Sequence, residues 1–146
     1  MSADKTTDDT ARAIDVLART IWGEARGEGP RGMEAVAAVV LNRVAVANRH
    51  GGYWWGKDIA DVCLKPFQFS CWNANDPQRA KLLSVAENNI HFATALRIAR
   101  RAAYGLLPDS VAGATHYHTL DILPRWAQGQ TPVAIIGHHM FYRLEA

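Results

Sequence analysis

The sequence predicts a single α+β domain that is mostly helical and carries a small β-hairpin in its C-terminal third. Apolar residues recur at helical spacing in residues 14–25 and again in residues 33–44, which indicates two amphipathic helices. After Pro108 the pattern changes to short aromatic segments bounded by glycines, which is typical of strands. A length of 146 residues, with 49% hydrophobic and 21% charged residues, suits one globular domain with a buried core.

The first helix is expected to follow a polar N-terminal tail. Residues 1–9 are polar and acidic, so we expect them to form a disordered tail ahead of a folded domain at residues 10–146. Asp9 or Thr10 can cap the helix, because their side-chain oxygens accept hydrogen bonds from free backbone N–H groups. The helix is expected to run to about Arg26 and to be stopped by Gly27, Gly29 and Pro30.

The second helix is expected to begin near Pro30, since proline is favoured in the first turn of a helix. Its apolar residues form one stripe, but Val39 and Val46 lie outside that stripe. We therefore expect this helix to be buried on more than one side and to be the central element of the core. The stripe consists of Met33, Val36, Ala37, Val40, Leu41 and Val44.

The remaining elements are predicted from turn signals. Residues 50–56 combine glycines with three aromatic side chains and are expected to form an exposed loop. The pair Asp76-Pro77 is a strong helix start, and a further helix is expected from Ile90 to Tyr104, ending at Gly105. Short strands are expected within residues 114–119 and 133–143, joined by a loop from Pro124 to Pro132.

The composition argues against nucleic-acid binding and membrane insertion. The formal net charge is only +2, and basic residues are not concentrated beyond the short cluster Arg97, Arg100 and Arg101. No apolar run approaches the roughly 18 residues that a membrane-spanning helix needs. We expect a monomer that neither binds nucleic acid nor spans a membrane.

Glu24 is the strongest candidate for acid catalysis. It lies near the end of the first helix, beside a glycine, at the border of the apolar stripe. A carboxyl group at such a border is partly desolvated, which raises its pKa and keeps a proton available near neutral pH. Helix geometry alone leaves open that Glu24 and Glu28 are surface residues paired with Arg26 or Arg31.

Four blocks of the sequence carry a resemblance that extends from about Arg12 to Arg143. The blocks are residues 18–28 (ARTIWGEARGE) with 32–44 (GMEAVAAVVLNRV), 66–72 (PFQFSCW), 113–118 (GATHYH) and 136–142 (IGHHMFY). In this order they closely resemble the SleB-type cell wall hydrolases, the family of the spore-cortex-lytic enzymes. A match of several ordered blocks is much more specific than any single motif.

The resemblance implies a lysozyme-like fold and an enzyme that degrades peptidoglycan without a cofactor or metal. In the family, the glutamate of the motif Gly-Glu-Ala-Arg-Gly-Glu is the essential acid, and the matching residue here is Glu24. The family resembles lytic transglycosylases, in which one glutamate protonates the glycosidic oxygen and then removes the proton from the 6-hydroxyl of muramic acid. The expected product has a 1,6-anhydromuramyl end, because no water is consumed.

Residues 68–72 and 116–118 are expected to line the sugar-binding cleft. In an extended loop Gln68, Ser70 and Trp72 would share one side, and polar groups beside an indole suit a sugar. The alternative is a buried turn whose polar side chains satisfy backbone groups. Glu28 can equally cap the next helix, and the aromatic residues Tyr53, Trp54 and Trp55 can extend the cleft. The candidate substrate contacts are Gln68, Ser70, Trp72, His116, Tyr117, His118 and Glu28.

Histidines suggest a second hypothesis, a zinc-dependent amidase or peptidase. His116 and His118 share one face of a predicted strand, and with His138 and His139 four imidazoles could converge on zinc, with Glu24 as the base. The sequence has no His-Glu-x-x-His motif and none of the common Cys/His spacings, so we expect no metal. A third hypothesis is a non-enzymatic, peptidoglycan-binding component of a phage-like particle.

The N-terminus and the two cysteines bear on the cellular compartment. Residues 1–10 lack the basic and apolar regions of a secretory signal. We therefore expect synthesis in the cytoplasm and action on the cell wall after cell lysis, release through a holin, or delivery by a phage or tail particle. Cys63 and Cys71 are close enough in sequence for a small disulfide ring, but free thiols are expected.

Overall fold

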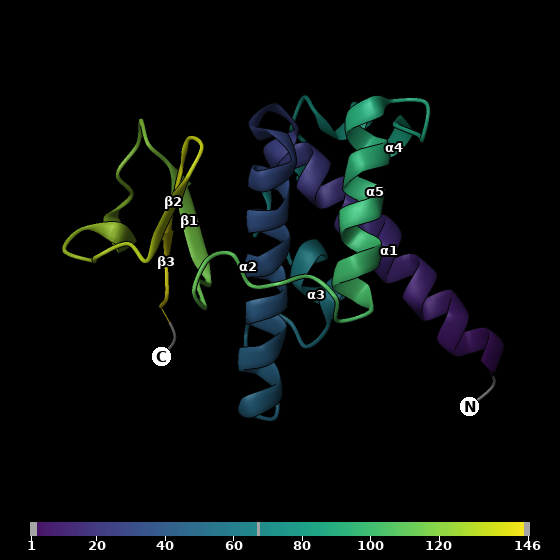
Figure 1. Ribbon diagram of the computed structural model, residues 1–146, viewed down its shortest axis with the longest axis horizontal. Coiled ribbons are helices and arrows are strands. Elements are labelled where there is room, and N and C mark those ends of the chain that lie inside the picture. Colours follow the sequence, from purple (N-terminus) through teal and green to yellow (C-terminus); the bar gives the residue numbers. More distant parts are fainter. Residues whose placement is uncertain (1–2, 67, 145–146) are drawn as a thin grey trace.

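The computed structural model of the chain describes residues 3–66 and 68–144 and shows a layered arrangement. The helices are α1 (Ala3–Ala25), α2 (Gly29–Arg49), α3 (Ile59–Leu64), α4 (Arg79–Ser84) and α5 (Ile90–Ala103), the strands are β1 (His116–Thr119), β2 (Ala134–Ile136) and β3 (His139–Tyr142), and the 3-10 helices are η1 (Arg26–Glu28), η2 (Ser70–Trp72) and η3 (Arg125–Ala127). In Figure 1 the sheet lies on one side of α2, and α1, α4 and α5 lie on the other. The predicted fold class, a mostly helical α+β domain with a small C-terminal β element, is confirmed.

The start of α1 differs from the prediction. The helix begins at Ala3, so the expected start at Asp9 or Thr10 is wrong, and residues 3–9 are helical. Polar residues reduce the stability of a helix only slightly, unlike glycine and proline, and aspartates near the N-terminus of a helix interact favourably with the helix dipole. Residues 1 and 2 of the expected tail lie outside the described residues. At its other end α1 stops at Ala25, close to the predicted end.

As predicted, α2 is the central element of the core and buries residues on more than one side. Val36 and Val40 pack into a cluster shared with α1, α3 and α5. Ala38 and Val39 pack instead against Phe141 of the sheet. Burying a large aliphatic side chain stabilises a fold by roughly 1.5–3 kcal/mol. Because α2 buries such side chains both against the helices and against the sheet, it holds these two parts together.

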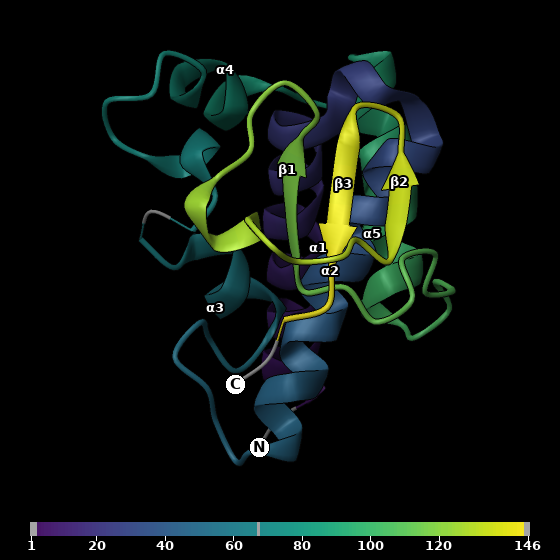
Figure 2. The same ribbon diagram turned by 90° about the vertical axis from the view of Figure 1, so that its left-hand side faces the viewer.

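The sheet has three antiparallel strands in the order β1-β3-β2 (Figure 2). Strands β2 and β3 form a hairpin, and β1 pairs with the other side of β3. Side chains alternate between the two faces of a strand. Tyr117 and its paired residue Phe141 therefore share the face that packs on α2, whereas His116 and His118 share the opposite face, as predicted.

The outer face of the sheet is covered by the segment between β1 and β2. Trp126 of η3 places its ring 5.2 Å from the ring of His116, 5.7 Å from His118 and 5.3 Å from Tyr142, measured between centroids. Aromatic pairs at such distances each contribute about 0.5–1.5 kcal/mol beyond the area they bury. These contacts fix η3 over the two histidines of β1.

The loop at residues 50–56 contains one core residue. Trp54 is 64% exposed, as expected for a loop, but Trp55 is only 1% exposed. The Trp55 indole N–H donates to the backbone oxygen of Arg43 at 2.9 Å, and the Arg43 guanidinium lies over the Trp55 ring. The expectation that Trp55 is exposed is therefore wrong, because contacts with α2 bury it.

The next two helices lie close to their predicted positions. The Asp76 carboxylate accepts a hydrogen bond from the backbone N–H of Gln78 at 2.8 Å, so Asp76 forms the turn before α4 rather than its cap. Helix α5 is capped by Asn89, which accepts from two backbone N–H groups. It ends just before Gly105, whose φ of 72° suits glycine at a helix end.

The cysteines lie in the core. Cys63 and Cys71 are both buried and free. Both belong to the cluster that α1 forms with α2 and α5. No helix in residues 3–66 and 68–144 is long and apolar enough to cross a membrane.

Gly23 allows α1 to pack closely against Cys71. A Cβ atom added at Gly23 would lie 2.8 Å from Cys71 Cβ, 2.9 Å from Cys71 Sγ and 3.1 Å from Leu82 Cδ1. Well-packed interiors accommodate such an added atom only by moving their neighbours. The absence of a side chain at Gly23 thus sets the distance between α1 and η2.

We expect Gly23→Ala to lower the free energy of unfolding by about 1–3 kcal/mol, because the added methyl group overpacks this contact. Gly27→Ala is the matched control, since a Cβ at Gly27 meets no atom within 4 Å. We expect the control to change stability by no more than about 0.5 kcal/mol. Urea denaturation followed by circular dichroism measures both, and equal stability of Gly23→Ala and wild type would contradict the tight contact.

Candidate active site

Glu24 lies in the last turn of α1 and is half-buried. Tyr117 of β1 donates a hydrogen bond from its hydroxyl to Glu24 Oε1 at 2.7 Å. Tyr117 reaches Glu24 because it lies on the face of the sheet that packs toward the helices. One hydrogen bond thus connects the end of the first helix to the first strand.

The environment of Glu24 favours its protonated form. Burial raises the pKa of Glu24 above the ordinary value of 4.5, because a charged carboxylate loses water when it is buried. The Tyr117 hydroxyl, and the thiol and backbone N–H of Cys71, partly oppose this shift by stabilising the carboxylate. Asp76 raises the pKa further through charge repulsion. Glu24 is therefore suited to donate a proton and then to remain stable as a carboxylate.

Glu24 opens into a pocket of about 200 Å³ between the helices and the sheet. Pockets for whole drug-sized ligands are usually about 300–1,000 Å³, so this one suits a small part of a polymer. Glu24 is the only carboxylate among the described residues that line it. The lining residues are Glu24, Arg43, Gln68, Phe69, His116, Tyr117 and Trp126.

Arg43 contributes a buried positive charge to the pocket. Its side chain comes from α2, and its Nε–H donates to the backbone oxygen of Thr115 at 2.7 Å. The guanidinium carbon lies 5.1 Å from the centroid of the Trp55 ring and 5.8 Å from that of Phe69. Burial lowers the pKa of Arg43 to about 10, which leaves it charged at neutral pH.

His116 connects this pocket to a second hollow. Burial, with a smaller effect of the Arg43 charge, lowers the pKa of His116 to about 4, so the imidazole is neutral at pH 7. The second hollow, of about 430 Å³, is lined by His116 together with Tyr53, Trp54 and Trp55. The aromatic loop therefore lines a hollow that shares His116 with the Glu24 pocket.

Among the three predicted contacts of the 66–72 block, the structure brings only Gln68 into the pocket. Its Nε2 donates to the backbone oxygens of Trp55 and Val62, so it also holds the loop together. The expected extended loop is wrong for Ser70 and Trp72, which lie in the 3-10 helix η2. Ser70 is exposed, and the Trp72 indole N–H donates to Thr20 Oγ1 at 2.9 Å. Neither of these two side chains lines the pocket as described.

Glu28 binds the β2–β3 turn rather than an arginine. Its carboxylate accepts hydrogen bonds from the backbone N–H of His138 at 3.2 Å and lies 3.2 Å from His138 Nδ1. Oε1, which accepts from the His138 N–H, also lies 3.5 Å from Nδ1 of the buried His139. Glu28 precedes α2 but its side chain makes no capping hydrogen bond, so its contacts favour a structural role.

The four histidines do not gather at one point. His118 is buried, with Nδ1 at 2.7 Å from the backbone oxygen of Thr119 and Nε2 at 2.8 Å from the Tyr142 hydroxyl. His116 lies on the same face of β1, but His138 and His139 contact Glu28. In the part of the chain that the structure describes, no group of three or more His, Cys, Asp or Glu side chains is placed to hold a metal ion.

Four residues that line the pocket or contact Glu24 were not predicted from the sequence: Arg43, Phe69, Cys71 and Trp126. For Arg43 a signal exists, because it follows Val36 and Val40 at helical spacing and thus lies on a buried face of α2. A charged residue at such a position is rarely buried without a function or a partner. Cys71 and Trp126 reach the site through contacts between segments that are distant in the sequence. Local sequence pattern does not predict such contacts.

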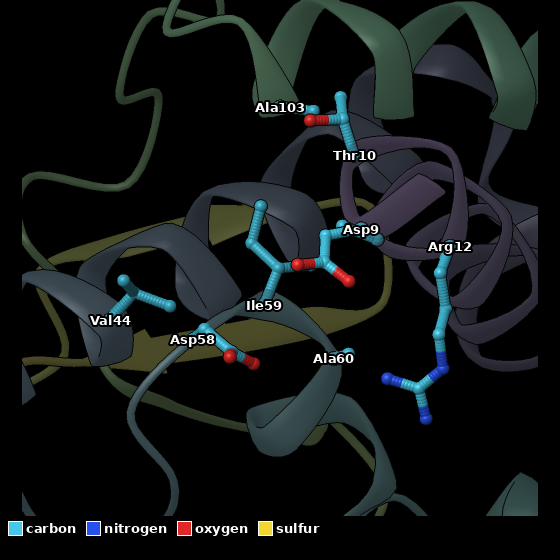
Figure 3. A pocket seen from close by; sticks show the side chains of 9 residues that line it. Asp9, Thr10, Arg12, Val44, Asp58, Ile59, Ala60 and Ala103 are labelled. Atoms are coloured by element: carbon cyan, nitrogen blue, oxygen red, sulfur yellow. The ribbon is translucent and has the colours of Figure 1, made fainter. Parts of the chain in front are cut away.

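A larger pocket of about 480 Å³ lies elsewhere, between α1, α2, α3 and α5 (Figure 3). Its carboxylates, Asp9 and Asp58, are exposed to solvent. Asp58 already accepts a hydrogen bond from the backbone N–H of Asp61 and caps α3. Size alone therefore does not select a candidate active site, and the half-buried carboxyl of Glu24 with its raised pKa makes the smaller pocket the stronger candidate.

We expect Glu24→Gln to make the folded protein more stable above the folded-state pKa of Glu24. Because this pKa is raised on folding, the folded state holds the proton more tightly than the unfolded chain. The free energy of unfolding of the wild type therefore falls as the pH rises through this window, and an amide escapes that loss. Denaturant unfolding from pH 4 to 8 measures the difference, which should shrink below about pH 4.5.

The control for this measurement is Glu34→Gln. Glu34 forms a partly exposed ion pair with Arg101 at 2.6 Å, and such pairs contribute little. A Glu24→Gln variant that is less stable than wild type at pH 8, with an unchanged control, would contradict the desolvated carboxyl.

We expect Tyr117→Phe to raise the pKa of Glu24 further, because it removes the hydroxyl that stabilises the carboxylate. The phenyl ring should keep the contacts that Tyr117 makes with Phe141 and His139. Titration of the Glu24 side-chain carbon by NMR measures the shift. Tyr104→Phe, at an exposed tyrosine, should leave it unchanged. An unchanged or lower pKa in Tyr117→Phe would mean that this hydrogen bond is not formed in solution.

Comparison with known proteins agrees with the sequence resemblance. A model of the family described as Cell Wall Hydrolase matches residues 27–142. The chain is 30% identical to a spore cortex-lytic enzyme of Halalkalibacterium halodurans and 28% identical to one of Bacillus cereus, each over 131 residues and 88% of this chain. It spans 34% and 43% of the length of these two relatives.

Two solved structures have the same fold. One is the catalytic domain of the Bacillus cereus SleB protein, with a TM-score of 0.67 and 27% identity over 89% of this chain and 88% of that chain. The other is the catalytic domain of the germination-specific lytic transglycosylase SleB from Bacillus anthracis, with the same score and identity over 93% of that chain. The family match extends over most of the sequence, and the fold is shared at this level of identity. The chain therefore belongs to the cell wall hydrolase family.

Proposed function

We propose that this domain cleaves the bond between N-acetylmuramic acid (MurNAc) and N-acetylglucosamine (GlcNAc) in peptidoglycan, as a lytic transglycosylase. The observation that carries the proposal is the half-buried carboxyl of Glu24 with its raised pKa, opening into a pocket. Cleavage of a glycosidic bond needs a proton on the leaving oxygen, and a glutamate with a raised pKa supplies it. The cell wall is accordingly the proposed place of action.

In the first step Glu24 gives its proton to the glycosidic oxygen as the bond from this oxygen to C1 of MurNAc breaks. Glu24 becomes a carboxylate at that moment. The Tyr117 hydroxyl, at 2.7 Å, and Cys71 then stabilise the new charge without a cation. Hydrogen bonds that strengthen as charge develops lower the barrier of such a step.

In the second step the 6-hydroxyl of the same MurNAc forms a bond to C1. Its proton passes to the Glu24 carboxylate, which restores the acid, so all atoms and charges balance without water. A hydrolase of the usual type needs a second carboxylate roughly 5–9.5 Å from the first. Glu24 is the only carboxylate among the described lining residues, which supports a nucleophile supplied by the sugar itself.

The relatives support the same class of reaction. The curated relatives are called spore cortex-lytic enzymes, and one solved domain is called a germination-specific lytic transglycosylase. The chain spans less than half the length of those curated relatives, so their substrates are carried here only as part of the proposal.

We expect Glu24→Gln to reduce the release of muropeptides from purified sacculi by at least about 10²-fold. This is the lower end of the rate enhancement that a general acid usually contributes. The fold should persist, because glutamine can still accept the Tyr117 hydrogen bond. Glu34→Gln, which changes a surface ion pair, is the matched control and should retain activity. Activity in Glu24→Gln equal to that of the control would remove Glu24 from its proposed role.

Mass spectrometry of the released products distinguishes the mechanisms in the same assay. Anhydromuramyl ends support the transglycosylase, whereas reducing ends indicate a hydrolase. Free stem peptides, or activity lost on adding a chelator, would indicate the zinc amidase instead.

A further inference from the structure

Arg43 is a buried cation without a counter-ion. The residue is 8% exposed, and within the described part of the chain only its Nε–H has a hydrogen-bond partner, the backbone oxygen of Thr115 at 2.7 Å. Among residues 7–66 and 68–144, no carboxylate lies within ion-pair distance of the guanidinium. Burying an uncompensated charge is costly, so its retention at this place calls for a ligand that supplies the missing charge.

The position of Arg43 leaves its terminal nitrogens available to a ligand. The Nε–H bond and the rings of Trp55 and Phe69 hold the guanidinium plane, but none of these contacts uses Nη1 or Nη2. Arg43 lines the same pocket as Glu24. His116, which lines the same pocket, is neutral at pH 7 and does not compete with Arg43 for an anion.

The shape of a guanidinium identifies the chemistry of the ligand. A fixed fork of N–H donors matches the two oxygens of a carboxylate, and such charge-assisted pairs are among the strongest hydrogen bonds in proteins. In a peptide-free glycan strand of alternating GlcNAc and MurNAc, the carboxylate belongs to the lactyl ether on MurNAc. GlcNAc is the same sugar without that ether.

We infer that Arg43 binds the lactyl carboxylate of MurNAc and is the residue by which this domain distinguishes MurNAc from GlcNAc. The inference rests on the proposed function, because it takes the sugar beside Glu24 to be MurNAc. It adds a substrate preference: glycan whose lactyl groups are free carboxylates binds more tightly than glycan whose lactyl groups are amide-linked to stem peptides. An amide carbonyl offers one neutral oxygen where a carboxylate offers two charged ones.

The first test uses the wild-type domain and three small sugars. Binding of MurNAc, of its methyl ester and of GlcNAc is measured by NMR titration of backbone amides at low salt. We expect MurNAc to bind about tenfold more tightly than the other two, the usual effect of one hydrogen-bonded charge pair. Equal affinities for MurNAc and its ester would overturn the inference without any variant.

The second test assigns the preference to Arg43. We expect Arg43→Gln to bind the three sugars equally, and Arg43→Lys to retain only part of the preference, because lysine keeps the charge but not the fork. Arg125→Gln is the matched control, since Arg125 is exposed and does not line the pocket. A purely structural arginine would change stability but not the ratio between MurNAc and its ester. A folded Arg43→Gln variant that keeps the full ratio would overturn the assignment.

The failure of this inference can be distinguished from the failure of the proposed function. Glu24→Gln should leave the preference for MurNAc over its ester in place, because the acid and the cation are separate groups of the pocket. A domain that binds MurNAc through Arg43 but releases no muropeptides would refute the proposed function alone. A domain that cleaves glycan, but cleaves peptide-free and peptide-bearing strands with equal kcat/KM, would refute the inference alone.

Discussion

The site depends on the hydrogen bond from Tyr117 to Glu24, because burial keeps this acid protonated and the bond stabilises its carboxylate once the proton has left. Burial alone would make the carboxylate of Glu24 unstable once its proton had left. A lysine or arginine in the place of Tyr117 would have the opposite fault, since it would lower the pKa and remove the proton before reaction. A neutral hydroxyl at 2.7 Å avoids both extremes.

The rest of the fold holds Tyr117 at this distance. The two-sided packing of α2 fixes the separation between α1 and the sheet, with Phe141 beside Tyr117 on the face that α2 covers. Glu28 makes a second connection between the same parts, because its carboxylate binds the turn between β2 and β3. Two glutamates four residues apart thus attach the end of α1 to the sheet, and only Glu24 opens into the pocket.

Local sequence pattern predicts those parts of the molecule that depend on neighbours in the chain. The stripe of α2, the start and end of α5 and the face shared by His116 and His118 follow from periodicity and turn residues. Glu24 was proposed as the catalytic acid because it lies both at the border of the apolar stripe of the first helix and in the motif Gly-Glu-Ala-Arg-Gly-Glu. The burial of Trp55 and the turn of η2 were not predictable in this way, because they depend on contacts with α2 and with Thr20 of α1.

The pocket keeps its acid and its cation apart, and this separation explains why both groups remain useful. Burial is the main cause that raises the pKa of Tyr117; the Glu24 carboxylate raises it further, and the Arg43 guanidinium opposes this shift. Arg43 and Glu24 form no ion pair. A direct ion pair would ionise Glu24 and occupy the guanidinium of Arg43. The acid would then have no proton to donate, and the cation would have no free N–H group for an anion. With an aromatic ring beside both groups, the acid can serve the glycosidic oxygen while the cation stays free for an anion of the substrate.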